Sequence, residues 1–114
     1  MEALVCADHS PLRLAVREVP EPTPHANEAV IEVRAVSLNR GELRALESAA
    51  VGWRPGWDLA GVVHTRAADG SGPAPGTRVV GLVRAGAWAE RVPVATHLLA
   101  ALPDEVSFAD ASKI

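Results

Sequence analysis

The chain has 114 residues and a formal net charge of −3, with 48% hydrophobic and 22% charged residues. These values indicate one folded domain and exclude wholesale disorder. There is no basic cluster, so we expect no nucleic-acid partner. No apolar run approaches the ~20 residues that span a bilayer, and the N-terminal MEALVCADHS lacks the basic start of a signal peptide. A single cysteine, Cys6, excludes an intramolecular disulfide and favours the cytoplasm.

Nine glycines and nine prolines indicate many turns and therefore short strands. Alternating apolar residues and β-branched runs predict seven strands. In chain order these strands are Met1–Cys6, Leu12–Val19, Glu28–Leu38, Asp58–Ala67, Thr77–Val83, Ala87–Val94 and Leu98–Leu102. Segments rich in turn-forming residues predict the connections Asp8–Pro11, Glu21–Ala29, Ala49–Trp57, Ala68–Gly76 and Arg84–Gly86.

The segment Asn39–Ser48 changes period: its leucines and glutamates suit a short helix, with Asn39 as a possible N-cap. Ser107 and Asp110 have the spacing of a second helix start, with Ser107 as the cap. That helix has room for only one or two turns before Ile114, so we expect the N-terminal part of something longer. Short strands with one small helix suggest a closed or partly open β-barrel.

Motifs for metal, nucleophilic and dinucleotide chemistry are missing from the sequence. Cys6 and the histidines His9, His25, His64 and His97 are scattered without metal-ligand spacing. There is no Gly-x-Ser-x-Gly, and no Gly-x-Gly-x-x-Gly follows a strand. The residues alone therefore predict no metal site and no phosphate cradle.

Two clusters remain as candidate sites. The first, Asn39–Glu42, lies where a strand ends and a helix begins, a common place for sites because backbone amides point outward there. The second, Pro55–Asp58, starts the next strand beside Trp53. Composition alone favours turn chemistry at both. Trp53 and Trp57 could line a pocket, or simply close one end of the barrel.

Six segments in a fixed order carry a resemblance to a known family. They are MEALV, VRAVSLNRGEL (Val33–Leu43), PGWDLAGVV (Pro55–Val63), PGTRVVGL (Pro75–Leu82), GAWAERVPV (Gly86–Val94) and LPDEVSFADA (Leu102–Ala111). In this order they resemble the N-terminal, GroES-like catalytic domain of medium-chain dehydrogenases/reductases, in the quinone-oxidoreductase-like branch.

The resemblance implies a mainly β fold, a GroES-like partly open β-barrel with one short helix. It places the catalytic domain at residues 1–106 and the start of the helix that leads to a Rossmann domain at 107–114. Relatives continue into that Rossmann domain, which binds most of the dinucleotide, and then return to complete the catalytic domain. The chain is thus expected to stop where the Rossmann domain would begin and to be inactive by itself. The apolar surface left bare favours a partner or a homodimer.

The resemblance also implies a zinc-free enzyme. In zinc-dependent members the positions of Asn39 and Trp57 hold a Cys and a His ligand, and those of Gly41 and Asp58 hold a proton-relaying hydroxyl and a Glu. An amide and an indole replace the two ligands here. This agrees with the absence of ligand spacing found from the residues alone.

Zinc-free relatives typically use NADPH to reduce quinones, enones or enoyl thioesters, so a small-molecule substrate and NADP(H) are expected. The resemblance assigns Asn39 a catalytic and cofactor-contacting role, and Arg40 either a cofactor contact or a solvent-facing position. Trp53 and Trp57 are expected to line the substrate pocket, and Glu42 to be structural. The alternatives are a non-enzymatic GroES-like interaction module and an enoyl-reductase piece of a polyketide-type assembly.

Overall fold

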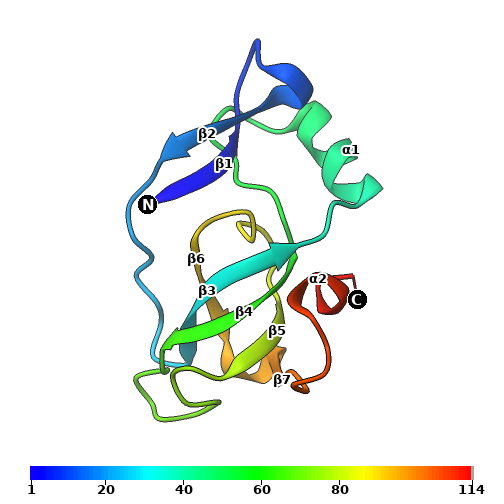
Figure 1. Ribbon diagram of the computed structural model, residues 1–114. Helices are drawn as coiled ribbons and strands as arrows, with labels where there is room; N and C mark the ends of the chain where they lie inside the picture. The colour runs from blue at the N-terminus through cyan, green and yellow to red at the C-terminus, as the bar shows by residue number, and fades with distance from the viewer. Residues whose placement is uncertain (114) are drawn as a thin grey trace.

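Residues 1–113 are described by the computed structural model in Figure 1. They form seven strands, two short α-helices and two short 3₁₀ turns. In chain order the elements are β1 (Glu2–Cys6), η1 (Pro11–Arg13), β2 (Leu14–Glu18), β3 (Glu28–Val36), α1 (Arg40–Ser48), β4 (Asp58–Thr65), β5 (Arg78–Leu82), β6 (Arg91–Ala95), η2 (Thr96–Leu98), β7 (Leu99–Ala101) and α2 (Phe108–Ala111). The prediction of a mainly β fold is confirmed.

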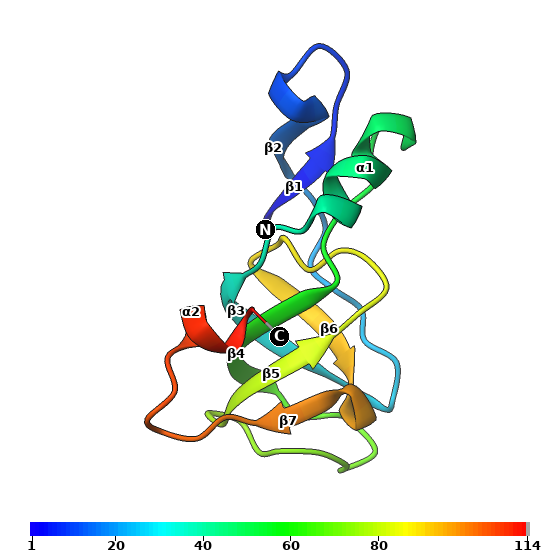
Figure 2. The ribbon, with the colours of Figure 1, turned by 90° about the vertical axis from the view of Figure 1, so that its right-hand side faces the viewer.

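Five strands form one antiparallel sheet in the order β6-β3-β4-β5-β7. Ile31 at its centre pairs with Val63 of β4 on one side and with Val92 of β6 on the other. The sheet curls, as Figure 2 shows, but its two edge strands are not hydrogen-bonded to each other. The fold is therefore the partly open barrel that the sequence predicted.

The core lies inside the curled sheet and below α1. Its fully buried side chains come from the large sheet and from α1. They include Ile31 of β3, Leu59 of β4, Val79 of β5, Val94 of β6 and Leu46 of α1. β5 and β6 bury alternate residues, because successive side chains point to opposite faces of a sheet. β3 and β4 instead bury runs of consecutive residues, Ala29 to Ile31 and Asp58 to Gly61, and are therefore covered on both faces there.

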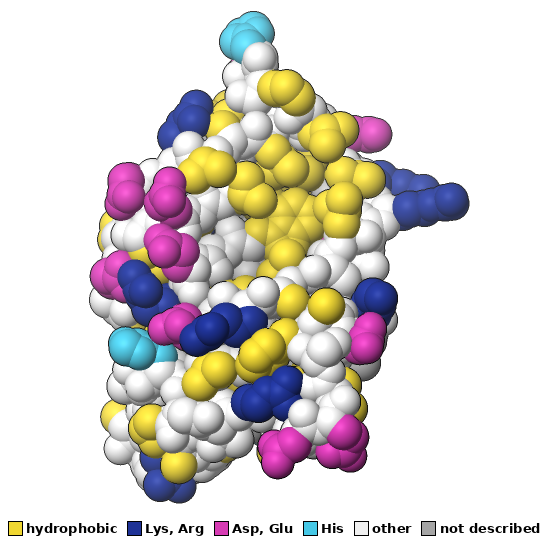
Figure 3. Space-filling view, in the orientation of Figure 1, with side chains coloured by type: hydrophobic (Ala, Val, Ile, Leu, Met, Phe, Trp, Pro, Cys, Tyr) yellow, Lys and Arg dark blue, Asp and Glu magenta, His cyan; other side chains and the backbone are white. Residues whose placement is uncertain are grey.

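The hairpin of β1 and β2 stands apart from the large sheet, beside α1 (Figures 1 and 2). Backbone hydrogen bonds hold β1 in place: the Leu4 amide donates to the Trp88 carbonyl at 2.9 Å, and the Cys6 amide to the Trp53 carbonyl at 2.7 Å. Figure 3 shows apolar side chains gathered between the hairpin and α1. Leu12 and Leu38 are more than 60% exposed.

Two predicted strands begin later than expected. The strand predicted over Leu12–Val19 begins at Leu14, because Leu12 and Arg13 both have a φ of +56°. Val16 on β2 is 54% exposed, so this strand does not present the half-buried apolar face that its alternation suggested. The strand predicted over Ala87–Val94 begins at Arg91.

The segment before β6 leaves the strand path because it pairs with a loop. The Ala87 amide donates to the Gly56 carbonyl at 3.1 Å, which turns Ala87 and Trp88 inward to buried positions. Gly56 has a φ of +102°, and a Cβ there would lie 2.6 Å from the Trp88 ring. Only glycine combines that backbone angle with so close an approach.

Both predicted helices are present. Asn39 is the N-cap of α1, and Ser107 caps α2 by accepting a hydrogen bond from the Asp110 amide at 3.1 Å. The predicted helix start at 107–114 reaches Ile114, which lies outside the described residues. No helix within residues 1–113 is long and apolar enough to cross a membrane.

Candidate active site

The structure brings the two predicted clusters together at one end of β3. The chain leaves β3 at Val36, and Asn39 begins α1 beside the first residue of β4, Asp58. The half-buried Asn39 side chain directs its Nδ2 toward the Ser37 hydroxyl at 3.3 Å and the Asp58 carboxylate at 3.5 Å. The side-chain nitrogen of Asn39 makes both contacts, and they fix the orientation of the amide group.

A single buried carboxylate joins the two clusters through their backbones. Glu42 is fully buried. One of its oxygens accepts from the Asn39 amide at 2.8 Å and the other accepts from the Trp57 amide at 3.1 Å. Burial raises the pKa of Glu42 above its usual 4.5, and the nearby Asp58 charge adds to this, while the hydrogen bonds oppose it. Glu42 thus fixes the separation of Asn39 and Trp57, in keeping with the structural role predicted for it.

Asp58 and Ser37 form the second half of this polar network. Asp58 is 2% exposed and accepts a hydrogen bond from the Ser37 hydroxyl at 2.6 Å. The Trp88 indole N–H donates to the Ser37 carbonyl at 3.3 Å. Ser37 and Trp88 were not predicted from the sequence to be site residues. Ser37 sits two residues before the candidate Asn39, but nothing in that spacing indicates a contact with Asp58.

The Trp57 indole lies against the first turn of α1. A Cβ built on Gly41 would lie 2.6 Å from the far edge of the Trp57 ring. A side chain at position 41 and the observed position of Trp57 therefore exclude each other. Trp57 can occupy its observed position because residue 41 is a glycine.

The other two predicted site residues lie away from this network. Arg40 is exposed at the first position of α1. Trp53 is half-buried and lines a hollow of about 760 Å³, whose lining does not include Trp57. The two tryptophans therefore do not share this hollow, although they come from one loop.

Metal-ligating side chains do not converge in the part of the chain that is described. Within residues 1–113 there is no group of three or more His, Cys, Asp or Glu side chains close enough to hold one ion. At the candidate site, Asp58 and Glu42 are the carboxylates, and both accept hydrogen bonds from protein groups. Amide and indole side chains are not among the ligands that zinc takes in proteins.

Comparison with known proteins supports the fold and the family. The model of the alcohol dehydrogenase GroES-like domain matches residues 25–104, which is more than half of the chain. The structure is similar to the human synaptic vesicle membrane protein VAT-1 homolog-like protein, with 28% identity over all of this chain and 39% of that one and a TM-score of 0.91.

Two bacterial oxidoreductases are also similar. A probable oxidoreductase from Mycobacterium abscessus is 30% identical, with 98% of this chain and 38% of that one covered and a TM-score of 0.85. The quinone oxidoreductase from Thermus thermophilus, studied also in complex with NADPH, is 29% identical, with 100% and 36% covered and a TM-score of 0.81.

The chain therefore belongs to the family of alcohol dehydrogenase GroES-like domains, the catalytic domains of medium-chain dehydrogenases/reductases. It spans between 36% and 39% of the length of these three relatives.

Proposed function

We propose that this chain is the catalytic-domain portion of an NAD(P)H-dependent oxidoreductase that reduces a quinone, an enone or a similar activated double bond without zinc. The similarity to a quinone oxidoreductase known in complex with NADPH supports the reaction class. Because the chain covers 36% of that enzyme, we assign the activity to the complete polypeptide. The dinucleotide supplies the hydride when it is bound.

The observation that carries the proposal is the way Asn39 is held. Its side-chain nitrogen points to Ser37 and Asp58, and its backbone amide is bound by Glu42. The side-chain oxygen faces the Glu42 backbone amide in the capping box of α1, and its second lone pair is suited to accept a hydrogen bond from a ligand. We infer that Asn39 orients a carboxamide such as that of nicotinamide. We further infer that Arg40, which is exposed at the start of α1, meets a phosphate of the same ligand.

The mutation Asn39→Ala tests this role in the complete polypeptide encoded by the reading frame that contains these residues. We expect kcat/KM for NADPH-dependent quinone reduction to fall about 10- to 100-fold, because an orienting contact is lost. Arg44→Ala, on an exposed part of the same helix, is the matched control and should leave kcat/KM unchanged. An unchanged kcat/KM for Asn39→Ala would show that the amide is only a helix cap. Absence of any NADPH-dependent turnover in the complete polypeptide would favour a non-enzymatic interaction module.

The zinc-free assignment is supported by the residues at the site. Asn39 offers an amide, Trp57 an indole, and Gly41 no side chain at all. We expect the purified chain, dialysed against a chelator, to contain less than about one tenth of an equivalent of zinc, since structural and catalytic sites need three or four Cys, His or carboxylate ligands. Elemental analysis by mass spectrometry measures this. Near-stoichiometric zinc that survives dialysis would refute the assignment.

A further inference from the structure

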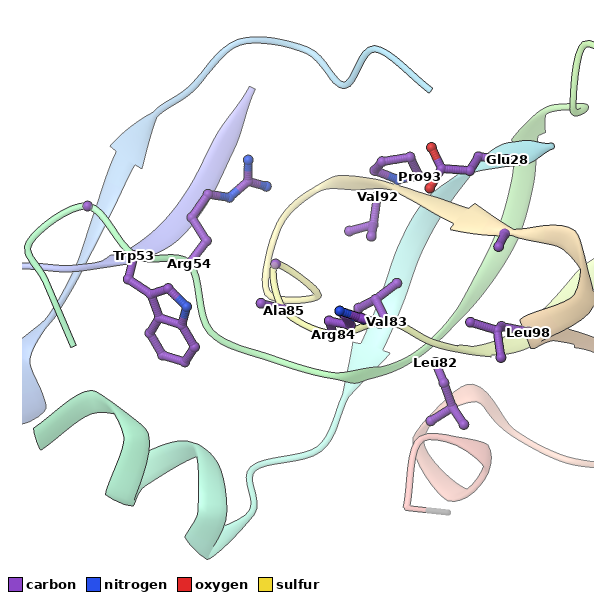
Figure 4. Close-up of a pocket in the computed structure, with 13 residues that line it drawn as sticks. Glu28, Trp53, Arg54, Leu82, Val83, Arg84, Ala85, Val92, Pro93 and Leu98 are labelled. Carbon is purple, nitrogen blue, oxygen red and sulfur yellow. The ribbon is translucent and has the colours of Figure 1, made fainter. Parts of the chain in front are cut away.

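The hollow that Trp53 lines lies beside β6, an edge strand of the large sheet. Its wall combines β6, the end of β5, the connection between them and the loop before β4. Figure 4 shows apolar side chains such as Val83, Val92 and Leu98 around it. Its volume of about 760 Å³ lies within the range of sites for small organic molecules, and its lining is mostly apolar with a few polar groups.

Two guanidinium groups line the same hollow. Arg54 comes from the loop before β4 and Arg84 from the connection between β5 and β6, and Figure 4 shows Ala85 between them in this view. Within residues 1–113, neither forms an ion pair with a carboxylate. Four other Lys and Arg side chains of the described part do so, namely Arg13, Arg34, Arg91 and Lys113.

The one carboxylate in the lining is engaged elsewhere. Glu28 accepts a hydrogen bond from the His25 amide at 2.8 Å, and its oxygen lies 3.5 Å from the His25 ring. It stands at the opposite end of the hollow from Arg54 in Figure 4. The lining therefore carries two positive charges against one negative charge, on a chain whose net charge is −3.

Arg54 also has an unsatisfied buried donor. Its Nε atom is shielded from solvent and has no hydrogen-bond partner among the described residues. A buried donor without a partner is costly, but a shielded Nε is out of reach of a ligand oxygen in the hollow. The terminal N–H groups of the guanidinium are not among the buried atoms, and they are the donors that can meet a carboxylate, sulfonate or phosphate.

We propose that this hollow binds a small organic anion: an apolar body lies against Trp53 and Val92, and its anionic group lies at Arg54 and Arg84. The apolar lining and the two unpaired cations each match one part of such a ligand. The site does not contain Asn39 or Trp57, so it does not rest on the function proposed above.

The probe is 8-anilinonaphthalene-1-sulfonate, whose fluorescence increases in apolar surroundings, and the matched neutral probe is N-phenyl-1-naphthylamine. The purified chain is titrated with each. We expect Arg54→Gln and Arg84→Gln each to weaken sulfonate binding about tenfold, the typical loss of one charge-assisted hydrogen bond, and to change binding of the neutral probe less than about twofold. Arg44→Gln, which removes the same charge from α1 outside the hollow, should change neither.

Several results would overturn the proposal. One is a wild-type chain that does not bind the sulfonate. Another is equal weakening of both probes, which would mean apolar binding only. A third is an equal effect of Arg44→Gln, which would mean that net charge alone matters. Thermal unfolding by circular dichroism checks each variant. Arg84 is exposed on a turn, so Arg84→Gln decides the question by itself if Arg54→Gln does not fold.

Discussion

Glu42 holds the two segments of the candidate site together through hydrogen bonds to their backbones. Its two oxygens accept from the amides of Asn39 and Trp57, which belong to different segments. A glutamine could accept only one of these bonds and would turn an N–H₂ group toward the other amide. An apolar residue would leave both buried amides without partners. The backbone of the site therefore requires the carboxylate.

The raised pKa of Glu42 gives a pH dependence whose sign is fixed. Its folded-state pKa is above the unfolded value of 4.5, so the folded chain binds this proton more tightly than the unfolded chain does. The resulting stability is fully present below 4.5 and is lost as the pH rises through the raised pKa. Glu21, whose pKa Arg91 lowers to about 2, acts only in the range below 4.5.

We therefore expect urea unfolding to show a free energy that falls as the pH rises above 4.5 in the wild type relative to Glu42→Gln, which cannot titrate. Glu47→Gln, exposed on the same helix, is the control and should keep the wild-type slope. A Glu42→Gln variant that also kept the wild-type slope would contradict the assignment.

At the scale of elements, α1 and the start of β4 are fitted to each other through Gly41 and Trp57. In an open helix an alanine would be favoured over glycine by about 1 kcal/mol. Here a Cβ would lie 2.6 Å from the Trp57 ring, so the ring must move. We expect overpacking to cost about 1–3 kcal/mol and the helix preference of alanine to offset about 1 kcal/mol of it, so Gly41→Ala should destabilise the chain by up to about 2 kcal/mol.

A double-mutant cycle with Trp57→Phe, whose ring is shorter, measures this contact. We expect Gly41→Ala to cost much less in the Trp57→Phe background, with a coupling energy on the order of 1 kcal/mol. Arg44→Ala, one turn along α1, should change the free energy of unfolding by less than about 0.5 kcal/mol. Additive effects of the two changes would mean that Trp57 does not rest on Gly41 in solution.

The elements that the sequence predicted well are those whose patterns are local. The β-branched run of β3 and the cap residue Asn39 specify their structures with their own side chains, and both are present as predicted. The start of β2 was wrong because Arg13 adopts a positive φ and donates from its Nη1 to the Leu46 carbonyl of α1 at 2.7 Å. The alternation of apolar and polar residues within Leu12–Val19 carries no information about a contact with a helix far along the chain.

In the candidate site, too, the local features could be predicted from the sequence and the long-range contacts could not. Both clusters could be located from strand ends and turns. Their meeting through Glu42, Asp58 and Ser37 depends on the pairing of β3 with β4, which is a property of the folded sheet. The orphaned Nε of Arg54 was equally invisible, because a guanidinium is expected to be solvated or paired until its surroundings are known.

At the scale of the whole molecule, the function proposed above would give the described chain one wall of a dinucleotide site. Asn39 and Arg40 are the residues that we expect to meet the cofactor, and both lie at the start of α1. Immobilising a ligand costs about 4–15 kcal/mol, which two polar contacts cannot offset. Hydride transfer also needs the reacting carbons held about 3–3.5 Å apart, and no second wall is present within residues 1–113 to hold them.

We therefore expect the 114-residue chain to fold as observed, to bind NADPH more weakly than about millimolar and to show no quinone-dependent NADPH oxidation above the buffer blank. The apolar area between the hairpin and α1, with Leu12 and Leu38 exposed, favours self-association, so light scattering should show a concentration-dependent dimer. Calorimetric titration and a turnover assay on the same preparation measure the first two expectations. Micromolar NADPH binding by this chain would show that the GroES-like domain carries enough of the cofactor site by itself. It would contradict the expectation that another domain supplies most of the cofactor contacts.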